Sequence, residues 1–114
     1  MKVHETVSSR QEALAERALC VAISLLRTPE ECRAFLRDLC TPTELQAMAD
    51  RWTVVEYIKR GLPYRKIHRL TGVSVTTIGR VARFLAEGNG GYETASRRVE
   101  ERRQTIGAAP RPAI

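Results

Sequence analysis

The cations of this chain are concentrated in one segment. Residues 51–86 carry eight lysines and arginines against a single acidic side chain, Glu56, whereas residues 1–50 have a net charge of −2. A basic block of this kind is the electrostatic footprint of a protein that binds a polyanion, and a merely solvated basic face is the alternative. The eight cations are Arg51, Lys59, Arg60, Arg65, Lys66, Arg69, Arg80 and Arg83.

Residue types that support catalysis or metal binding are scattered. Long gaps separate the three cysteines, Cys20, Cys32 and Cys40, no C-x-x-C motif occurs, and the two histidines, His4 and His68, lie far from them in sequence. The sequence therefore favours buried thiols in a reducing compartment over a metal site or disulfides. No nucleophile–base pair, paired carboxylates or phosphate-binding loop can be assembled, so we expect no enzyme.

Length and composition bound the class of protein. The 114 residues, of which 43% are hydrophobic, fit one small globular domain. No apolar run reaches the roughly 18 residues of a membrane span, and the first residues lack the apolar segment of a secretory signal. We therefore expect a cytoplasmic protein that does not enter membranes.

Helical periodicity dominates the first half of the chain. Between residues 10 and 27, Leu14, Ala18, Val21 and Leu25 recur at helical spacing, and further apolar residues widen this face. The face is broader than a small monomer easily covers, so it indicates packing against a second chain.

Two near-identical helix starts follow, T28-P-E-E31 and T41-P-T-E44. In each, threonine can cap the helix, proline suits the first helical position, and glutamate can bond back to the threonine N–H. The second helix is expected to end at Gly61 and to bury one stripe, composed of Leu45, Met48, Trp52, Val55 and Ile58.

The segment T71-G-V-S-V-T-T-I-G-R80 is rich in β-branched residues, which favours a strand by propensity. No other segment alternates like a strand that could pair with it, so we predict a helix from Val75 capped by Ser74. A short helix between Gly61 and Gly72 precedes it, and the two would form a helix-turn-helix. Hydrophobes and glycine occupy the positions typical of DNA-reading units of this kind, namely Ile67, Gly72, Val73, Ile78 and Val81.

The larger arrangement resembles the Trp repressor superfamily, particularly its YerC/YecD-type branch. The matching segments are L39-C-T-P-T-E-L-Q-A-M-A-D-R51, T71-G-V-S-V-T-T-I-G-R80 and L85-A-E-G-N-G-G-Y92, and the resemblance spans about residues 10–92. It implies an all-α helical bundle whose N-terminal helices interlock with those of a second copy in an intertwined homodimer. We expect this domain to cover residues 1–91, followed by a charged, mobile tail over residues 92–114 in which residues 92–103 could form a fraying helix.

On this interpretation the protein is a homodimeric, sequence-specific regulator of transcription, expected to be a repressor, that reads double-stranded DNA with the helix of residues 75–86. The expected DNA-binding residues are Arg65, Lys66, His68, Ser74, Val75, Thr76, Thr77, Gly79, Arg80 and Arg83. For His68, a structural role is the alternative to a phosphate contact. The competing function is a helix-turn-helix used for protein assembly, such as an antitoxin-like adaptor, without sequence-specific DNA readout.

The resemblance also implies a ligand pocket. In Trp repressor the corepressor lies between two arginines and is held by threonines, and the matching residues here are Thr41, Arg51, Thr77 and Arg80. Phe84 stands where the family helps to hold the ligand's ammonium group, so we expect L-tryptophan not to bind tightly. A different small-molecule effector stays open, and no cofactor is certain. Thr41 and Arg51 have simpler alternatives, a helix cap and a surface ion pair with Glu44 or Asp50.

Overall fold

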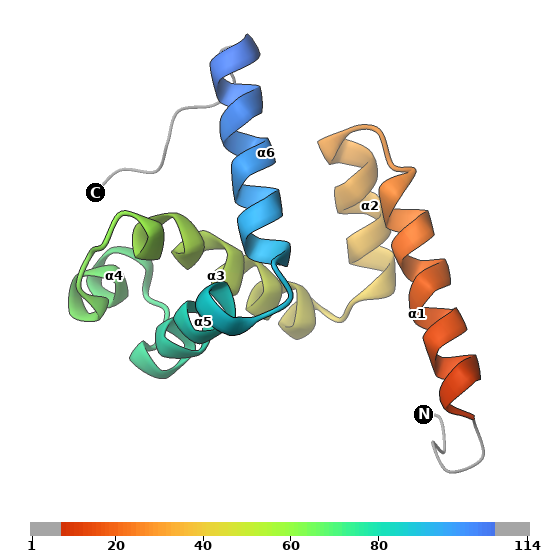
Figure 1. The fold of residues 1–114 in the computed structure, drawn as a ribbon, viewed down its shortest axis with the longest axis horizontal. Helices are drawn as coiled ribbons and strands as arrows, with labels where there is room; N and C mark the ends of the chain where they lie inside the picture. The colour runs from red at the N-terminus through yellow and green to blue at the C-terminus, as the bar shows by residue number, and fades with distance from the viewer. Residues whose placement is uncertain (1–7, 107–114) are drawn as a thin grey trace. The chain divides into compact units, whose positions relative to one another are not determined.

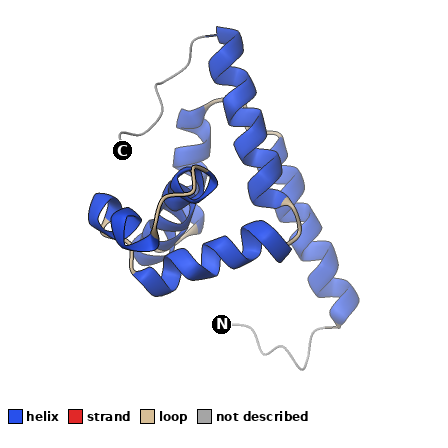
Figure 2. Ribbon diagram, turned by 60° about the vertical axis from the view of Figure 1, so that its left-hand side comes forward, coloured by secondary structure: helices blue, strands red, loops and turns tan. Residues whose placement is uncertain are grey.

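The computed structural model describes residues 8–106, and all its regular elements there are helices, as the sequence predicts (Figures 1 and 2). The helices are α1 (Ser9–Ser24), α2 (Pro29–Leu39), α3 (Pro42–Lys59), α4 (Tyr64–Thr71), α5 (Val75–Glu87) and α6 (Gly91–Ile106). The chain divides into two compact units, of which the first ends at Pro42 and the second begins at Thr43. None of the helices within residues 8–106 is both long and apolar enough to cross a membrane.

The first unit contains α1 and α2, and each begins at a side-chain cap. Ser8 and Gln11 form a reciprocal capping box at α1, and the Thr28 hydroxyl accepts from the Glu31 N–H at α2. The Glu31 carboxylate was expected to accept from the N–H of Thr28. It instead accepts from the N–H of the preceding residue, Arg27, at 2.8 Å. Neither helix contains a buried residue, which is unusual for helices with this many apolar side chains.

Helix α3 buries only part of the stripe that its sequence predicts, namely Val55 and, partly, Ile58. Val54, Val55 and Tyr57 are buried, whereas Met48 and Trp52 are 40% and 41% exposed. Val54 and Tyr57 belong to the core cluster that α4 and α5 complete, and Val55 also lines a groove beside α6. A helix that packs against neighbours on two sides has no single apolar stripe, and the prediction was wrong for Met48 and Trp52 for this reason.

The predicted helix-turn-helix is confirmed in α4, α5 and the turn between them. Gly72 has φ 76°, a left-handed conformation that favours glycine, and its N–H donates to the His68 carbonyl. The Thr71 hydroxyl donates to the Ile67 carbonyl at 2.7 Å and accepts from the Val73 N–H at 3.1 Å. Ser74 then caps α5 by accepting from the Thr77 N–H. The apolar side chains that hold the two helices together and against α3 are Ile67, Val73, Ile78 and Val81.

Helix α6 differs from the tail expected over residues 92–114. It contacts α5, and Tyr92 at its start packs against the core cluster. Lys59 of α3 pairs with Glu93 at 3.2 Å and donates to the Ser96 hydroxyl at 3.0 Å. Residues 91–106 are therefore a packed helix of the second unit, and the remainder of the expected tail, residues 107–114, lies outside the described residues.

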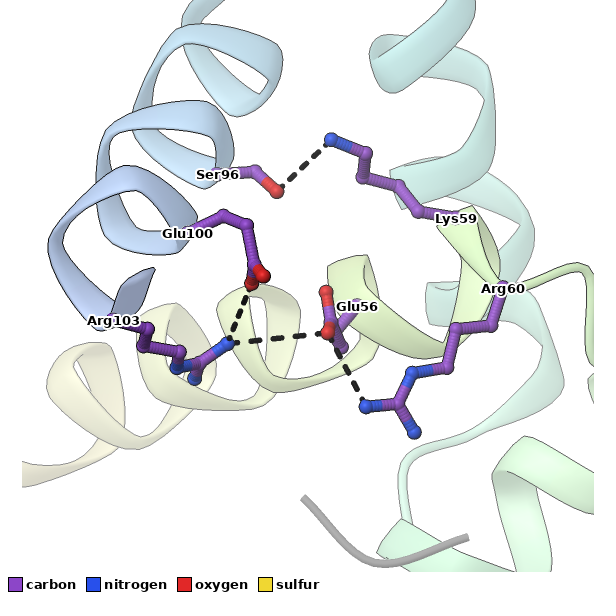
Figure 3. A network of polar contacts seen from close by, with 6 residues as sticks. All are labelled: Glu56, Lys59, Arg60, Ser96, Glu100 and Arg103. Atoms are coloured by element: carbon purple, nitrogen blue, oxygen red, sulfur yellow. Dashed lines mark hydrogen bonds and ion pairs between the residues drawn. The ribbon is translucent and has the colours of Figure 1, made fainter. Parts of the chain in front are cut away.

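A second set of ion pairs joins α6 to α3 one turn further on (Figure 3). The Arg103 guanidinium lies 3.5 Å from the Glu100 carboxylate on its own helix and 3.9 Å from Glu56 on α3. Glu56 also accepts from Arg60 at 3.3 Å. The contact between Arg103 and Glu56 connects residues more than 40 positions apart, so no local pattern in the sequence of α6 could indicate it.

Candidate nucleic-acid interface

The surface formed by α4 and α5 carries a large excess of positive charge. No aspartate or glutamate occurs between Gly61 and Ala86, while five lysines and arginines do, and all five side chains are exposed. Arg65, Lys66 and Arg69 come from α4, and Arg80 and Arg83 come from α5. Glu87, the last residue of α5, adds one carboxylate and pairs with Arg83 at 3.9 Å, so the net charge of this surface stays positive. In water, such a surface attracts a polyanion from a distance.

The first turn and a half of α5 exposes small and apolar side chains. Val75 is 47% exposed, Thr76 is exposed, and Gly79 lies half-buried one turn further along. Residues three and four apart share one face of a helix, so these three residues form a continuous patch. Methyl groups of valine and threonine are suited to contact the methyl group of thymine in the major groove.

Tyr64 belongs to this surface and was missed by the sequence interpretation. Its side chain is 42% exposed, and its ring passes alongside Gly79, with Cε2 3.9 Å from the position that a Cβ on Gly79 would occupy. Arg69 was also left out of the expected site, although it is exposed on the same short helix. The signal that could have found Arg69 is its spacing of four residues from Arg65, which places both on one face of α4.

Three of the expected site residues take part in the turn and the cap. The Ser74 hydroxyl donates to the Thr77 hydroxyl at 3.0 Å while accepting from the Thr77 N–H, so both side chains are used in starting α5. His68 Nδ1 lies 2.7 Å from the Val73 carbonyl, and because a carbonyl only accepts, Nδ1 carries the proton there. His68 therefore has a structural role, in which it stabilises the turn before α5. Its Nε2 stays available for a phosphate.

The second half of α5 stacks two cations on one ring. The guanidinium carbon of Arg80 lies 5.2 Å from the centroid of the Phe84 ring, and that of Arg83 lies 6.0 Å from it. Both distances are within the range of a cation–π contact. Phe84 is nevertheless 42% exposed, so its ring both orients Arg80 and stays open to solvent.

An open hollow of about 570 Å³ lies beside these residues. It brings together three of the five expected pocket residues, Arg51, Arg80 and Phe84. Thr77 does not line it, and the Thr77 hydroxyl accepts from Ser74, while Thr41 belongs to the other unit. The remaining lining residues are Val81, Gly88, Asn89, Gly91 and Tyr92.

The chemistry of this hollow suits an anion better than a cation. Its described wall contains two guanidiniums and two aromatic rings but no carboxylate. Asp50, one of the two carboxylates weighed as a partner of Arg51, accepts from Gln46 at 2.8 Å. Across the same residues, no group of three histidine, cysteine, aspartate or glutamate side chains is placed to hold a metal ion.

Comparison with known proteins places the chain in a family. The sequence profile of the Trp repressor protein family matches residues 15–100. The chain belongs to the Trp repressor family. Among curated proteins, it is 45% identical over 80 residues to the uncharacterized protein YerC of Bacillus subtilis (strain 168), a match that covers 70% of this chain and 77% of YerC.

Solved structures of Trp repressor family proteins share this fold. A Staphylococcus aureus protein provisionally assigned as a Trp repressor superposes with a TM-score of 0.70 at 37% identity, covering 88% of this chain and 95% of that one. A TrpR-like protein from Eubacterium eligens ATCC 27750 gives a TM-score of 0.65 at 28% identity, covering 86% and 96%. Members of the Trp repressor family are DNA-binding helix-turn-helix regulators rather than enzymes, which agrees with the basic surface of α4 and α5.

Proposed function

We propose that this protein is a homodimeric repressor of transcription that recognises a specific duplex DNA sequence in the cytoplasm. The observation that carries the proposal is the basic surface of α4 and α5, whose two helices carry five exposed cations together with the patch of Val75, Thr76 and the half-buried Gly79. Cations supply affinity for phosphates, and a helix face with exposed methyl groups can reach base edges.

In the proposed complex, α5 enters the major groove with its N-terminal residues foremost. Arg65 and Lys66 at the start of α4 and the capped start of α5 at Ser74 would hold the phosphates on either side. Val75 and Thr76 would meet base edges, and Arg80 and Arg83 would reach the backbone. Because the patch has few long polar side chains, part of the sequence preference would come from bridging water and from the shape of the DNA.

The apolar surface of the first unit supports assembly as a dimer. Leu14 and Val21 are 57% and 44% exposed on α1, which buries no residue at all, and Leu25 at its C-cap is 70% exposed. The second unit also exposes apolar side chains that a partner could contact. Trp52 and the 39%-exposed Val99 line a groove of about 230 Å³ between α3 and α6. Exposed apolar surface of this extent marks an interaction site in a folded protein, and a second copy presents matching surface.

A small-molecule effector that binds in the hollow beside Phe84 is a finer part of the proposal. An aromatic anion would find two guanidiniums and two rings there, namely those of Arg51, Arg80, Phe84 and Tyr92. L-tryptophan carries an ammonium group as well, and the described wall offers that group no carboxylate. We therefore expect an effector, if one is used, to lack a positive charge.

The test is a binding selection with the purified full chain on random duplexes, followed by anisotropy titrations of the selected sequence between 50 and 200 mM salt. The proposal requires a selected duplex that binds more tightly than its scrambled version, with affinity that falls steeply as salt rises. An assembly module without DNA readout predicts no enrichment of any sequence and little dependence on salt, and that result would replace the proposal with the adaptor function.

A further inference from the structure

We propose that Gly79 is a clearance position for DNA, at which the wall of the major groove approaches α5 so closely that any side chain weakens binding. The inference rests on the proposed function and adds a residue that determines how deeply the helix seats. Gly79 lowers the stability of the helix, and nothing in the fold around it requires a glycine.

Glycine is a poor choice for this position by local criteria. Gly79 is the fifth of the 13 residues of α5, well inside the helix. A glycine in a helix interior loses more backbone freedom on folding than alanine does, so it lowers helix stability. Some requirement outside helix formation must therefore account for the missing side chain.

The backbone supplies no such requirement. Left-handed φ values occur at Gly61, Gly72 and Gly90, but Gly79 has no positive φ. Gly88 is a second kind of case, because a Cβ there would collide with the carbonyl oxygen of Phe84. Gly79 belongs to neither kind.

Packing inside the protein supplies no requirement either. A Cβ built on Gly79 would meet the Tyr64 ring at 3.9 Å, which is ordinary van der Waals contact. An alanine at this position would therefore be accommodated without strain and would cover part of the ring. Within the described protein, nothing needs Gly79 to be a glycine.

The outer surface offers the remaining explanation. Gly79 lies on the same face as the exposed Val75 and Thr76 and next to the exposed Arg80. The ring of Tyr64 lies beside it. Removing the Cβ from the middle of such a face lowers it locally, which is how glycine permits another backbone to approach closely. The charged side chains of α4 and α5 are cationic except for Glu87 at the end of α5, so the approaching partner is the polyanion that they attract.

The deciding experiment compares Gly79→Ala with Gly91→Ala. Gly91 is the matched control because it too has no positive φ and has room for a Cβ, with no atom within 4 Å of one. It begins α6 and belongs to neither α4 nor α5, and the titrations contain no effector for the hollow that it lines. Melting temperature and affinity for the selected and scrambled duplexes are measured for the wild-type chain and each variant, and Gly79→Ser repeats the test with a hydroxyl.

We expect Gly79→Ala to raise the melting temperature by a few degrees while weakening binding to the selected duplex about tenfold or more. Gly79→Ser should weaken binding as well, the scrambled duplex should lose less, and Gly91→Ala should bind like the wild type. Unchanged or tighter binding by a folded Gly79→Ala overturns the inference, as does an equal loss on both duplexes or an equal loss in Gly91→Ala. Failure of the wild-type chain to prefer any duplex would instead overturn the proposed function, so the two failures are distinct.

Discussion

The ion pairs between α3 and α6 give a prediction whose size follows from geometry. Glu56 accepts from Arg60 at 3.3 Å and faces Arg103 at 3.9 Å, and the three side chains are 23%, 19% and 24% exposed. Partial burial reduces the screening of these pairs by solvent relative to fully exposed ones, each of which is worth about 0.2–1 kcal/mol. Replacing Glu56 by glutamine keeps the shape, removes the charge and leaves both guanidiniums with a neutral acceptor.

We expect Glu56→Gln to lower the free energy of unfolding by about 1 kcal/mol, which corresponds to a fall of roughly 4–8 °C in melting temperature for a domain of 60–100 residues. Glu87→Gln is the matched control, since Glu87 faces Arg83 at 3.9 Å with both side chains 74% exposed, and its effect should be near zero. Thermal unfolding followed by circular dichroism at 0.1 and 1 M salt measures both variants. Equal shifts for the two, or no shift for Glu56→Gln, would refute the reasoning that α6 is fastened to α3 through Glu56.

The remaining predictions concern assembly, DNA and the hollow. Sedimentation equilibrium at micromolar concentration should return a dimer, because α1 leaves its apolar face uncovered, and a single 12.8 kDa species would refute this. Lys66→Ala should weaken binding to all duplexes alike and reduce the slope of log affinity against log salt by about one. Thr76→Ala should instead change the preference at one base pair by about 1–3 kcal/mol. Titrations in which both variants have the same effects on selected and scrambled duplexes would argue against base reading by α5. Isothermal titration with L-tryptophan should show no tight binding, since the described wall of the hollow lacks a carboxylate for the ammonium group. Tryptophan should also not strengthen DNA binding in a shift assay. A micromolar dissociation constant together with tighter DNA binding would contradict this.

Helix starts and the turn were predictable because their determinants are local. Ser74 caps α5 and Gly72 takes the left-handed conformation through contacts within a few residues, so the sequence around them suffices. The β-branched residues of α5 did not mislead, since no partner strand was available and Ile78 and Val81 have the spacing of a buried helix face. The same local character explains why the exposed residues at the start of α5 could be named in advance.

Features that depend on distant residues were not predictable in the same way. Helix α6 looks like a charged tail because its partners, Glu56 and Lys59, lie in α3 far along the chain. The buried face of α3 depends on two neighbours at once, so one apolar stripe could not describe it. Tyr64 was missed because its position beside Gly79 arises only when α4 packs on α5.

Hydroxyl-radical footprinting of the protein on its selected duplex tests the central claim most directly, because it reports where α5 sits on the DNA. Two copies that each insert α5 into the major groove should protect two blocks about 10–10.5 base pairs apart, a separation of roughly 34–36 Å, on one face of the duplex. Thr76→Ala should leave the protein folded but weaken the protection of this sequence selectively. A continuous or absent footprint, or protection that is the same on a scrambled duplex, would contradict the account.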